Sequence, residues 1–151
     1  MSQATVRLPL GTFVGARSGD KGGNANVGVW VLDPQEAAAV ALAHGRQAEL
    51  VADPRAVELA DERYAWLTSI VTEDGVRRLL PECTDLDVDV HPLPNLRAIN
   101  VVIHALLGRG VAESSRVDPQ AKGLGEHLRS RLVDIPGHLV DGVQLTGGGD
   151  R

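Results

Sequence analysis

The chain has 151 residues and a mass of 16.0 kDa, enough for one domain but too short for two separate hydrophobic cores. Aromatic residues make up 3% of it and its net charge is −5, which argues against base-stacking platforms and basic nucleic-acid surfaces. The single cysteine, Cys83, excludes an internal disulfide, and no apolar run is long enough to span a membrane. We expect one domain over residues 1–145, a disordered tail over residues 146–151 and a cytoplasmic location.

The first third of the chain predicts two strands and a helix. Residues 10–16 and 26–32 contain many β-branched and apolar side chains, which favour strands. The segment between them, ARSGDKGGNA, is polar and glycine-rich, and we interpret it as a loop. Asp33-Pro34 is a typical helix start and Gly45 a typical helix end, so we expect an additional helix and linker within residues 33–62.

The middle of the chain predicts two helices followed by a strand. Apolar side chains recur at helical spacing from Arg55 to about Ile70, and a shorter helix follows from Thr72 to just before Pro81. Residues 85–91, DLDVDVH, alternate between polar and apolar side chains, which predicts a strand with its carboxylates in solvent. The segment lacks the glycine and glutamate that an EF-hand loop needs, so we reject a calcium site.

The segment of residues 96–107 is apolar almost all round, which we interpret as a central buried helix capped by Asn95. On such a helix Arg97, Asn100 and His104 would form one polar stripe. The stripe would either line a pocket or be satisfied by hydrogen bonds within the core, and the sequence leaves both interpretations open.

The last third of the chain predicts a short strand over residues 111–117 and a helix over residues 118–132. Arg116 and Lys122 flank the start of that helix, which makes a candidate anion-binding corner. The layer rules then predict an α+β fold, a mixed sheet of about four strands with helices packed on it.

The glycine-rich segment of residues 17–26 is the most unusual part of the sequence. It contains three glycines, two asparagines and the cations Arg17 and Lys21, and its backbone amides are suited to binding an anion. It is not a P-loop, because Asp20 and Gly22 stand where a P-loop has Gly and Ser or Thr. Composition leaves two interpretations equally weighted, a ligand site and a hairpin loop braced by internal charge pairs.

Two long motifs resemble one known family, the C-terminal domain of the acyclic terpene utilisation protein AtuA. The motifs are ARSGDKGGNANVGVWV and PNLRAINVVIHALLGRGVAESSRVDPQAKGLGEHL. The resemblance covers roughly residues 14–32, 64–80 and 93–128, although Gly23 stands where the family commonly has an acid. It implies a ferredoxin-like α+β sandwich in its stand-alone form and a setting in acyl-CoA or terpenoid catabolism.

The resemblance also implies a set of ligand-binding positions. They are Arg17, Ser18, Gly19, Asp20, Lys21, Gly22, Asn24, Asn26, Asn95, Asn100, Arg116 and Lys122. We expect the loop of residues 17–26 and Asn95 to meet at one end of the sheet and form a cleft.

Three functions are compatible with these observations. The first is a ligand-binding or accessory subunit of acyl-CoA or terpenoid-type catabolism; the second is a lyase or hydratase with Asp20 and Lys21 as its acid and base; the third is a purely structural oligomerisation subunit. The expected partners are further copies of this chain or a larger protein like the N-terminal part of AtuA, and an acyl-CoA or carboxylate ligand. We expect no metal, cofactor, nucleic acid or membrane partner.

Overall fold

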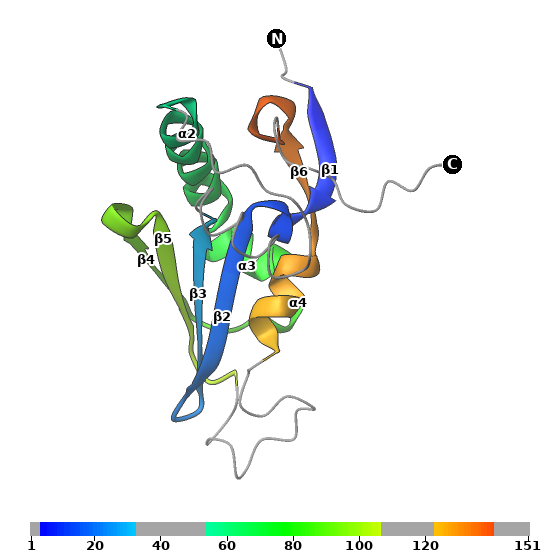
Figure 1. The fold of residues 1–151 in the computed structure, drawn as a ribbon. Helices are drawn as coiled ribbons and strands as arrows, with labels where there is room; N and C mark the ends of the chain where they lie inside the picture. Colours follow the sequence, from blue (N-terminus) through cyan, green and yellow to red (C-terminus); the bar gives the residue numbers. More distant parts are fainter. Residues whose placement is uncertain (1–3, 33–53, 107–122, 141–151) are drawn as a thin grey trace, which may run out of the picture.

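The computed structural model describes residues 4–32, 54–106 and 123–140 (Figure 1). The strands are β1 (Thr5–Pro9), β2 (Val14–Lys21), β3 (Asn24–Val31), β4 (Val88–Leu93), β5 (Ala98–Ile103) and β6 (Leu132–Pro136). The helices are α2 (Pro54–Ile70), α3 (Glu73–Leu79) and α4 (Leu124–Ser130). The expected helix after Asp33, the strand of residues 111–117 and the tail lie outside the described residues.

Four strands form the main sheet in the order β2-β3-β5-β4, while β1 and β6 form a separate pair (Figure 1). The predicted α+β fold with a four-stranded sheet is therefore confirmed. The expectation of a mixed sheet is wrong, because every described neighbouring pair is antiparallel. Short connections join β2 to β3 and β4 to β5, and such connections permit only antiparallel pairing.

The segment predicted to be a glycine-rich loop is instead the end of a tight hairpin. Strands β2 and β3 pair up to Lys21 and Asn24, so the turn consists only of Gly22 and Gly23. Their φ angles are 62° and 99°, the left-handed values that a two-residue hairpin turn requires and that glycine adopts without strain. The predicted strand of residues 10–16 is also wrong in its bounds, since Leu10–Thr12 is a short 3₁₀ turn between β1 and β2.

The segment predicted to be a central helix, residues 96–107, instead contains β5, which is one of the two central strands of the main sheet. Its sequence, AINVVI, is β-branched at four positions, and such side chains lose rotamer freedom in a helix but fit a pleated surface. Burial alternates along β5, with Ile99, Val101 and Ile103 in the core. The expected helical stripe does not exist, because residues of a strand alternate between its two faces.

Helices α2 and α3 confirm the two helices predicted for the middle of the chain. Thr72 caps α3, since its hydroxyl oxygen accepts the Gly75 N–H at 3.0 Å. The predicted strand of residues 85–91 is confirmed in part, because β4 begins only at Val88 and continues through Pro92. Proline is tolerated there because β4 is an edge strand of the sheet.

The C-terminal part of the chain differs from the predicted helix of residues 118–132. Helix α4 covers Leu124–Ser130, and the chain then enters β6, which the sequence analysis missed. Strand β6 pairs with β1, for example Ile135 with Val6. The described chain thus ends beside its own beginning (Figure 1).

The core lies between the helices and one face of the main sheet, and aliphatic side chains fill it as the composition predicts. It includes Ala25, Val27, Val29, Leu67, Val76, Leu80, Ile99, Ile103, Leu124 and Leu128. None of the described helices is both long and apolar enough to cross a membrane.

One cation, Arg63 of α2, is buried at the edge of this core, with 9% of its surface exposed. Its Nε donates to the Leu139 carbonyl oxygen at 2.8 Å, and its guanidinium lies 4.8 Å from the centre of the Phe13 ring. Burial lowers the pKa of Arg63 from its ordinary value. The carbonyl oxygen and the ring compensate the burial of this charge, because an unpaired charge in a low-dielectric region is costly.

Candidate functional site

The face of the main sheet that points away from α2, α3 and α4 carries several polar residues of the two motifs. Successive strand residues point to opposite faces, so burial on one face assigns the intervening residues to the other. We call this other surface the open face. Its residues are Gly15, Arg17, Gly19 and Lys21 of β2, Asn24, Asn26, Gly28 and Trp30 of β3, Ala98, Asn100 and Val102 of β5, and Asp89, His91 and Leu93 of β4.

One row of the open face crosses all four strands. The pairing aligns Arg17 with Gly28, Gly28 with Asn100, and Asn100 with His91. Three strand spacings separate the ends of this row, which is about 14 Å. A Cβ built on Gly28 would have only the Arg17 carbonyl oxygen within 4 Å, at 3.9 Å. The glycine therefore leaves a shallow gap between a guanidinium and an amide.

The next row contains an unsatisfied buried oxygen. Asn26 is aligned with Gly19 on one side and Val102 on the other. Its Oδ1 atom is buried and has no hydrogen-bond partner within residues 4–32, 54–106 and 123–140. A Cβ on Gly19 would meet nothing within 4 Å. The lack of a partner for this buried oxygen destabilises the fold.

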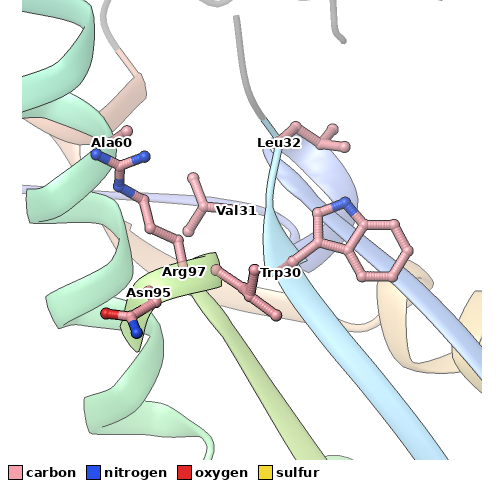
Figure 2. Close-up of a pocket in the computed structure, with 7 residues that line it drawn as sticks. Trp30, Val31, Leu32, Ala60, Asn95 and Arg97 are labelled. Atoms are coloured by element: carbon pink, nitrogen blue, oxygen red, sulfur yellow. The ribbon is translucent and has the colours of Figure 1, made fainter. Parts of the chain in front are cut away.

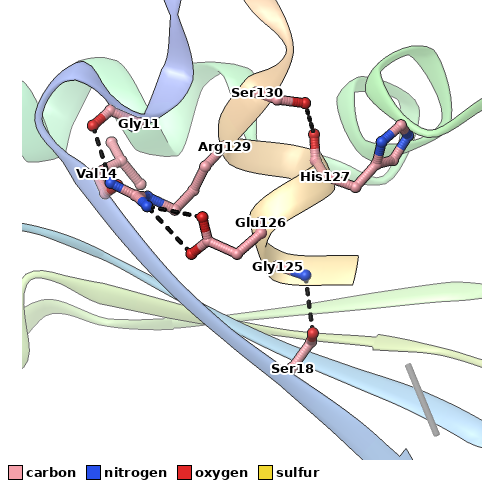
Figure 3. A network of polar contacts seen from close by, with 8 residues as sticks. All are labelled: Gly11, Val14, Ser18, Gly125, Glu126, His127, Arg129 and Ser130. Carbon is pink, nitrogen blue, oxygen red and sulfur yellow. Dashed lines mark hydrogen bonds and ion pairs between the residues drawn. The ribbon is translucent and has the colours of Figure 1, made fainter. Parts of the chain in front are cut away.

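The cations of the hairpin, Arg17 and Lys21, are exposed. Neither side chain forms an ion pair or a hydrogen bond with the described part of the chain. This differs from Arg129 of α4, whose guanidinium donates to the Val14 carbonyl oxygen at 2.8 Å and pairs with Glu126 at 3.0 Å (Figure 3). The hairpin cations are thus available to an anion.

The hairpin tip is tied to the end of β5. Asn24 Oδ1 accepts the Ala105 N–H at 2.8 Å, and Ala105 has a left-handed φ of 62°. Beside it, His104 Nε2 lies 2.6 Å from Asp89 Oδ2. This hydrogen bond is the main cause that lowers the pKa of the Asp89 carboxyl. The sequence analysis missed the pair because it depends on the register between β4 and β5.

Two residues of the motif, Ser18 and Asp20, lie on the other side of β2 and serve local structure. Ser18 Oγ accepts the Gly125 N–H at 2.8 Å, which joins α4 to β2 (Figure 3). Asp20 Oδ1 accepts the Gly23 N–H at 3.2 Å and braces the turn. Asp20 and Lys21 are sequence neighbours in a strand and therefore point to opposite faces. Their predicted role as an acid and base pair stays a prediction.

The expected meeting of the hairpin with Asn95 is wrong. The hairpin tip lies beside Ile103, at one end of β5, whereas Asn95 follows β4 at the other end, where Ala98 is aligned with Trp30. Five extended residues of β3 separate these ends, which is about 17 Å. In this antiparallel sheet the β2–β3 turn and the β4–β5 connection lie at opposite ends, a consequence of register that no local pattern reveals.

Asn95 instead borders a pocket of about 230 Å³ between α2, the end of β3 and the 3₁₀ turn η3 (Pro94–Leu96) (Figure 2). Its lining residues are Trp30, Val31, Leu32, Ala60, Asn95, Leu96 and Arg97. Arg97 was expected on a helical stripe that either lines a pocket or is satisfied within the core, and it lines this pocket from the end of a turn instead.

Two candidates for the anion corner, Arg116 and Lys122, lie outside the described residues. Within the described residues, no group of three or more His, Cys, Asp or Glu side chains is placed to hold a metal ion. Of the predicted site residues, the open face therefore brings together Arg17, Gly19, Lys21, Asn24, Asn26 and Asn100. It adds His91 and Trp30, which the sequence analysis did not select.

A comparison with protein families finds that the model of the AtuA ferredoxin-like domain matches residues 8–134. The match extends from β1 to β6 and includes both the open face and the Asn95 pocket. No curated protein and no solved structure gives a significant match.

Proposed function

The chain belongs to the AtuA ferredoxin-like domain family, and on that basis we propose that it is a ligand-binding or accessory subunit of acyl-CoA or terpenoid-type catabolism. The open face is its binding surface in this proposal. One observation carries it: strand pairing gathers Arg17, Lys21, Asn26 and Asn100, all from the two motifs, on a face that no described helix covers.

The chemistry of the open face suits a coenzyme A thioester or a related carboxylate. Phosphate and carboxylate groups pair well with a guanidinium and an ammonium that have no partner among the described residues, as is the case for Arg17 and Lys21. Gly19 and Gly28 leave room for a ligand to lie close to the sheet.

A purely structural role for the open face is less favourable. An interface that buried Arg17 and Lys21 would have to supply an acceptor for each charge, because a buried unpaired charge is costly. Further copies of the chain or a larger partner are therefore proposed to bind elsewhere or to contribute anionic groups. Light scattering with and without butanoyl-CoA measures the oligomeric state and distinguishes association elsewhere on the chain from association through the open face.

The proposal is tested by titrating the full chain with acetyl-CoA and butanoyl-CoA. We expect Lys21→Ala to weaken binding about tenfold or more, since a charge-assisted hydrogen bond contributes about 1.5–3 kcal/mol. The melting temperature should change little, because Lys21 is exposed and its side chain forms no hydrogen bond or ion pair within the described part of the chain.

Arg78→Ala is the matched control, since Arg78 is an exposed cation on α3, away from the open face. It should leave affinity unchanged and so exclude an effect of net charge. If Lys21→Ala lowers the melting temperature while affinity stays at the wild-type value, Lys21 is structural and the assignment of the site fails. Turnover of the thioester by the isolated chain would instead indicate the lyase or hydratase alternative.

A further inference from the structure

The geometry of the Asn95 pocket points to a second ligand site, and we propose that it binds a small carboxylate. The pocket lies at the end of the sheet opposite the hairpin, so it does not depend on the open-face cations Arg17 and Lys21. Its central group is the guanidinium of Arg97, which Figure 2 shows between α2 and the end of β3.

Arg97 is held in a backbone conformation that side chains rarely adopt. Its φ and ψ angles are 46° and 47°, in the left-handed region. Both of its backbone polar groups are fixed: the N–H donates to the Pro94 carbonyl oxygen at 3.1 Å, and the carbonyl oxygen accepts the Val31 N–H at 3.0 Å. Strained backbone positions of this kind concentrate at ligand sites. Here the fixed backbone sets the position from which the Arg97 side chain extends along the pocket.

The guanidinium of Arg97 has N–H donors that form no hydrogen bond within the described residues. Its Nε donates to Asp61 Oδ1 at 2.8 Å, and its side chain is 33% exposed. Among the described residues, neither terminal nitrogen has a hydrogen-bond partner, and neither has the side-chain amide of Asn95. Two terminal nitrogens in one plane match the two oxygens of a carboxylate, and the Asn95 amide on the same pocket adds a further donor.

The remaining lining residues have apolar side chains, but these contribute the smaller part of the surface that the pocket presents. Val31, Leu32, Ala60 and Leu96 are among them, and Leu96 is 70% exposed. A volume of about 230 Å³ is below the range of about 300–1,000 Å³ for drug-sized ligands. A small carboxylate fits both the cationic group and the volume, whereas a whole coenzyme A thioester does not fit the volume.

The carboxylate of Asp61 opposes an anion in this pocket, and this gives the proposal a specific consequence. Asp61 holds Nε and so orients the terminal nitrogens, but its charge repels the ligand. Asp61→Asn keeps an oxygen that accepts from Nε and removes the charge. It should therefore bind a carboxylate more tightly than the wild type, by about threefold or more.

The test uses ¹⁵N spectra of the full chain titrated with 3-methylbutanoate, acetate and inorganic phosphate at constant ionic strength. The amide signals of Val31, Leu96 and Arg97 report the pocket. We expect saturable shifts with acetate and 3-methylbutanoate at affinities within about threefold of each other. Phosphate should bind more weakly than either, because the Asp61 carboxylate repels its larger negative charge more strongly. An absence of saturable shifts, or equal affinity for all three anions, overturns the proposal.

Arg97→Gly is the informative variant, because glycine accepts the left-handed backbone and the fold should be retained. It should weaken binding at least tenfold. Arg7→Ala is the control, since Arg7 forms a comparable exposed pair with Asp134 on the β1–β6 sheet, and it should bind as the wild type does. Equal affinity of these two variants overturns the proposal. Lys21→Ala should not affect carboxylate binding, so this site and the open face can fail independently.

Discussion

Adjacent residues of β5 show how differently the two faces of the main sheet are built. Ile99 is 1% exposed and packs against the helices, whereas Asn100 lies on the open face in a row with Arg17 and His91. The cation buried on the helix side, Arg63, has a carbonyl oxygen and a ring as partners. The open-face cations have none among the described residues.

This contrast separates stability from binding. The helix-covered face supplies the apolar burial that drives folding, and the open face supplies polar groups whose loss removes little burial. Substitutions on one face should therefore change the free energy of unfolding, and substitutions on the other should change affinity.

The strongest test compares two neighbours in one strand. Ile99→Ala should lower the free energy of unfolding by about 2–4 kcal/mol, because it leaves a cavity in the core. Asn100→Ala should change it by only about 0.5 kcal/mol, since its side chain makes no hydrogen bond within the described residues. Urea denaturation of both variants gives the comparison. Similar losses for the two would show that the open face is part of the core.

Two glycines of β2 sharpen the picture of the open face itself. A Cβ on Gly15 would lie 2.6 Å from Cε2 of Trp30, which covers that position, so Gly15→Ala should cost about 1–3 kcal/mol. A Cβ on Gly19 would meet nothing within 4 Å, so Gly19→Ala should stay within about 0.5 kcal/mol of the wild type. Thermal melts of the pair measure the difference. Equal destabilisation would mean that Gly19 is also covered.

The sequence predicts well those elements whose signals are local. The helical spacing of α2 and the helix start predicted at Thr72 depend on signals within a few residues, and both helices are confirmed. The segment AINVVI was misassigned because a short apolar run fits a buried helix and a central strand equally well. The β-branched content of the segment indicates a strand, as the structure shows.

The candidate site is harder to predict from the sequence than the helices are, because it depends on pairing between distant strands. Polar strands on an open face resemble a loop in sequence, so only the Gly22-Gly23 turn marks the hairpin. The motif residues Arg17, Lys21 and Asn100 do share one face, but this follows from pairing between distant strands. The same pairing sends Asn95 to the far end of the sheet. Register is set by the whole core, and no local pattern fixes it.

An intermediate effect is expected at Ser18, the motif residue that joins β2 to α4. Ser18→Ala removes the oxygen that accepts the Gly125 N–H at 2.8 Å, and it should cost about 1 kcal/mol. Affinity for thioesters should be unchanged, because Ser18 lies on the helix side of the strand. Ser130→Ala is the control, since its exposed hydroxyl bonds only within α4. A loss of affinity without a loss of stability would move Ser18 to the binding surface.

The smallest expected effect concerns the pH dependence of the exposed His104–Asp89 pair. Hydrogen bonding to His104, followed by the charges of His104 and His91, lowers the pKa of Asp89 in the folded chain. A carboxyl whose folded pKa is lowered stabilises the fold above its unfolded pKa, about 3.9, and this contribution is lost as the pH falls through the folded pKa. His104→Ala should therefore melt slightly below the wild type at pH 5, and the difference should disappear near pH 2. His127→Ala, an exposed histidine of α4, should show no such convergence. If the wild type and His104→Ala differ equally at both pH values, His104 acts through packing and not through the Asp89 carboxylate.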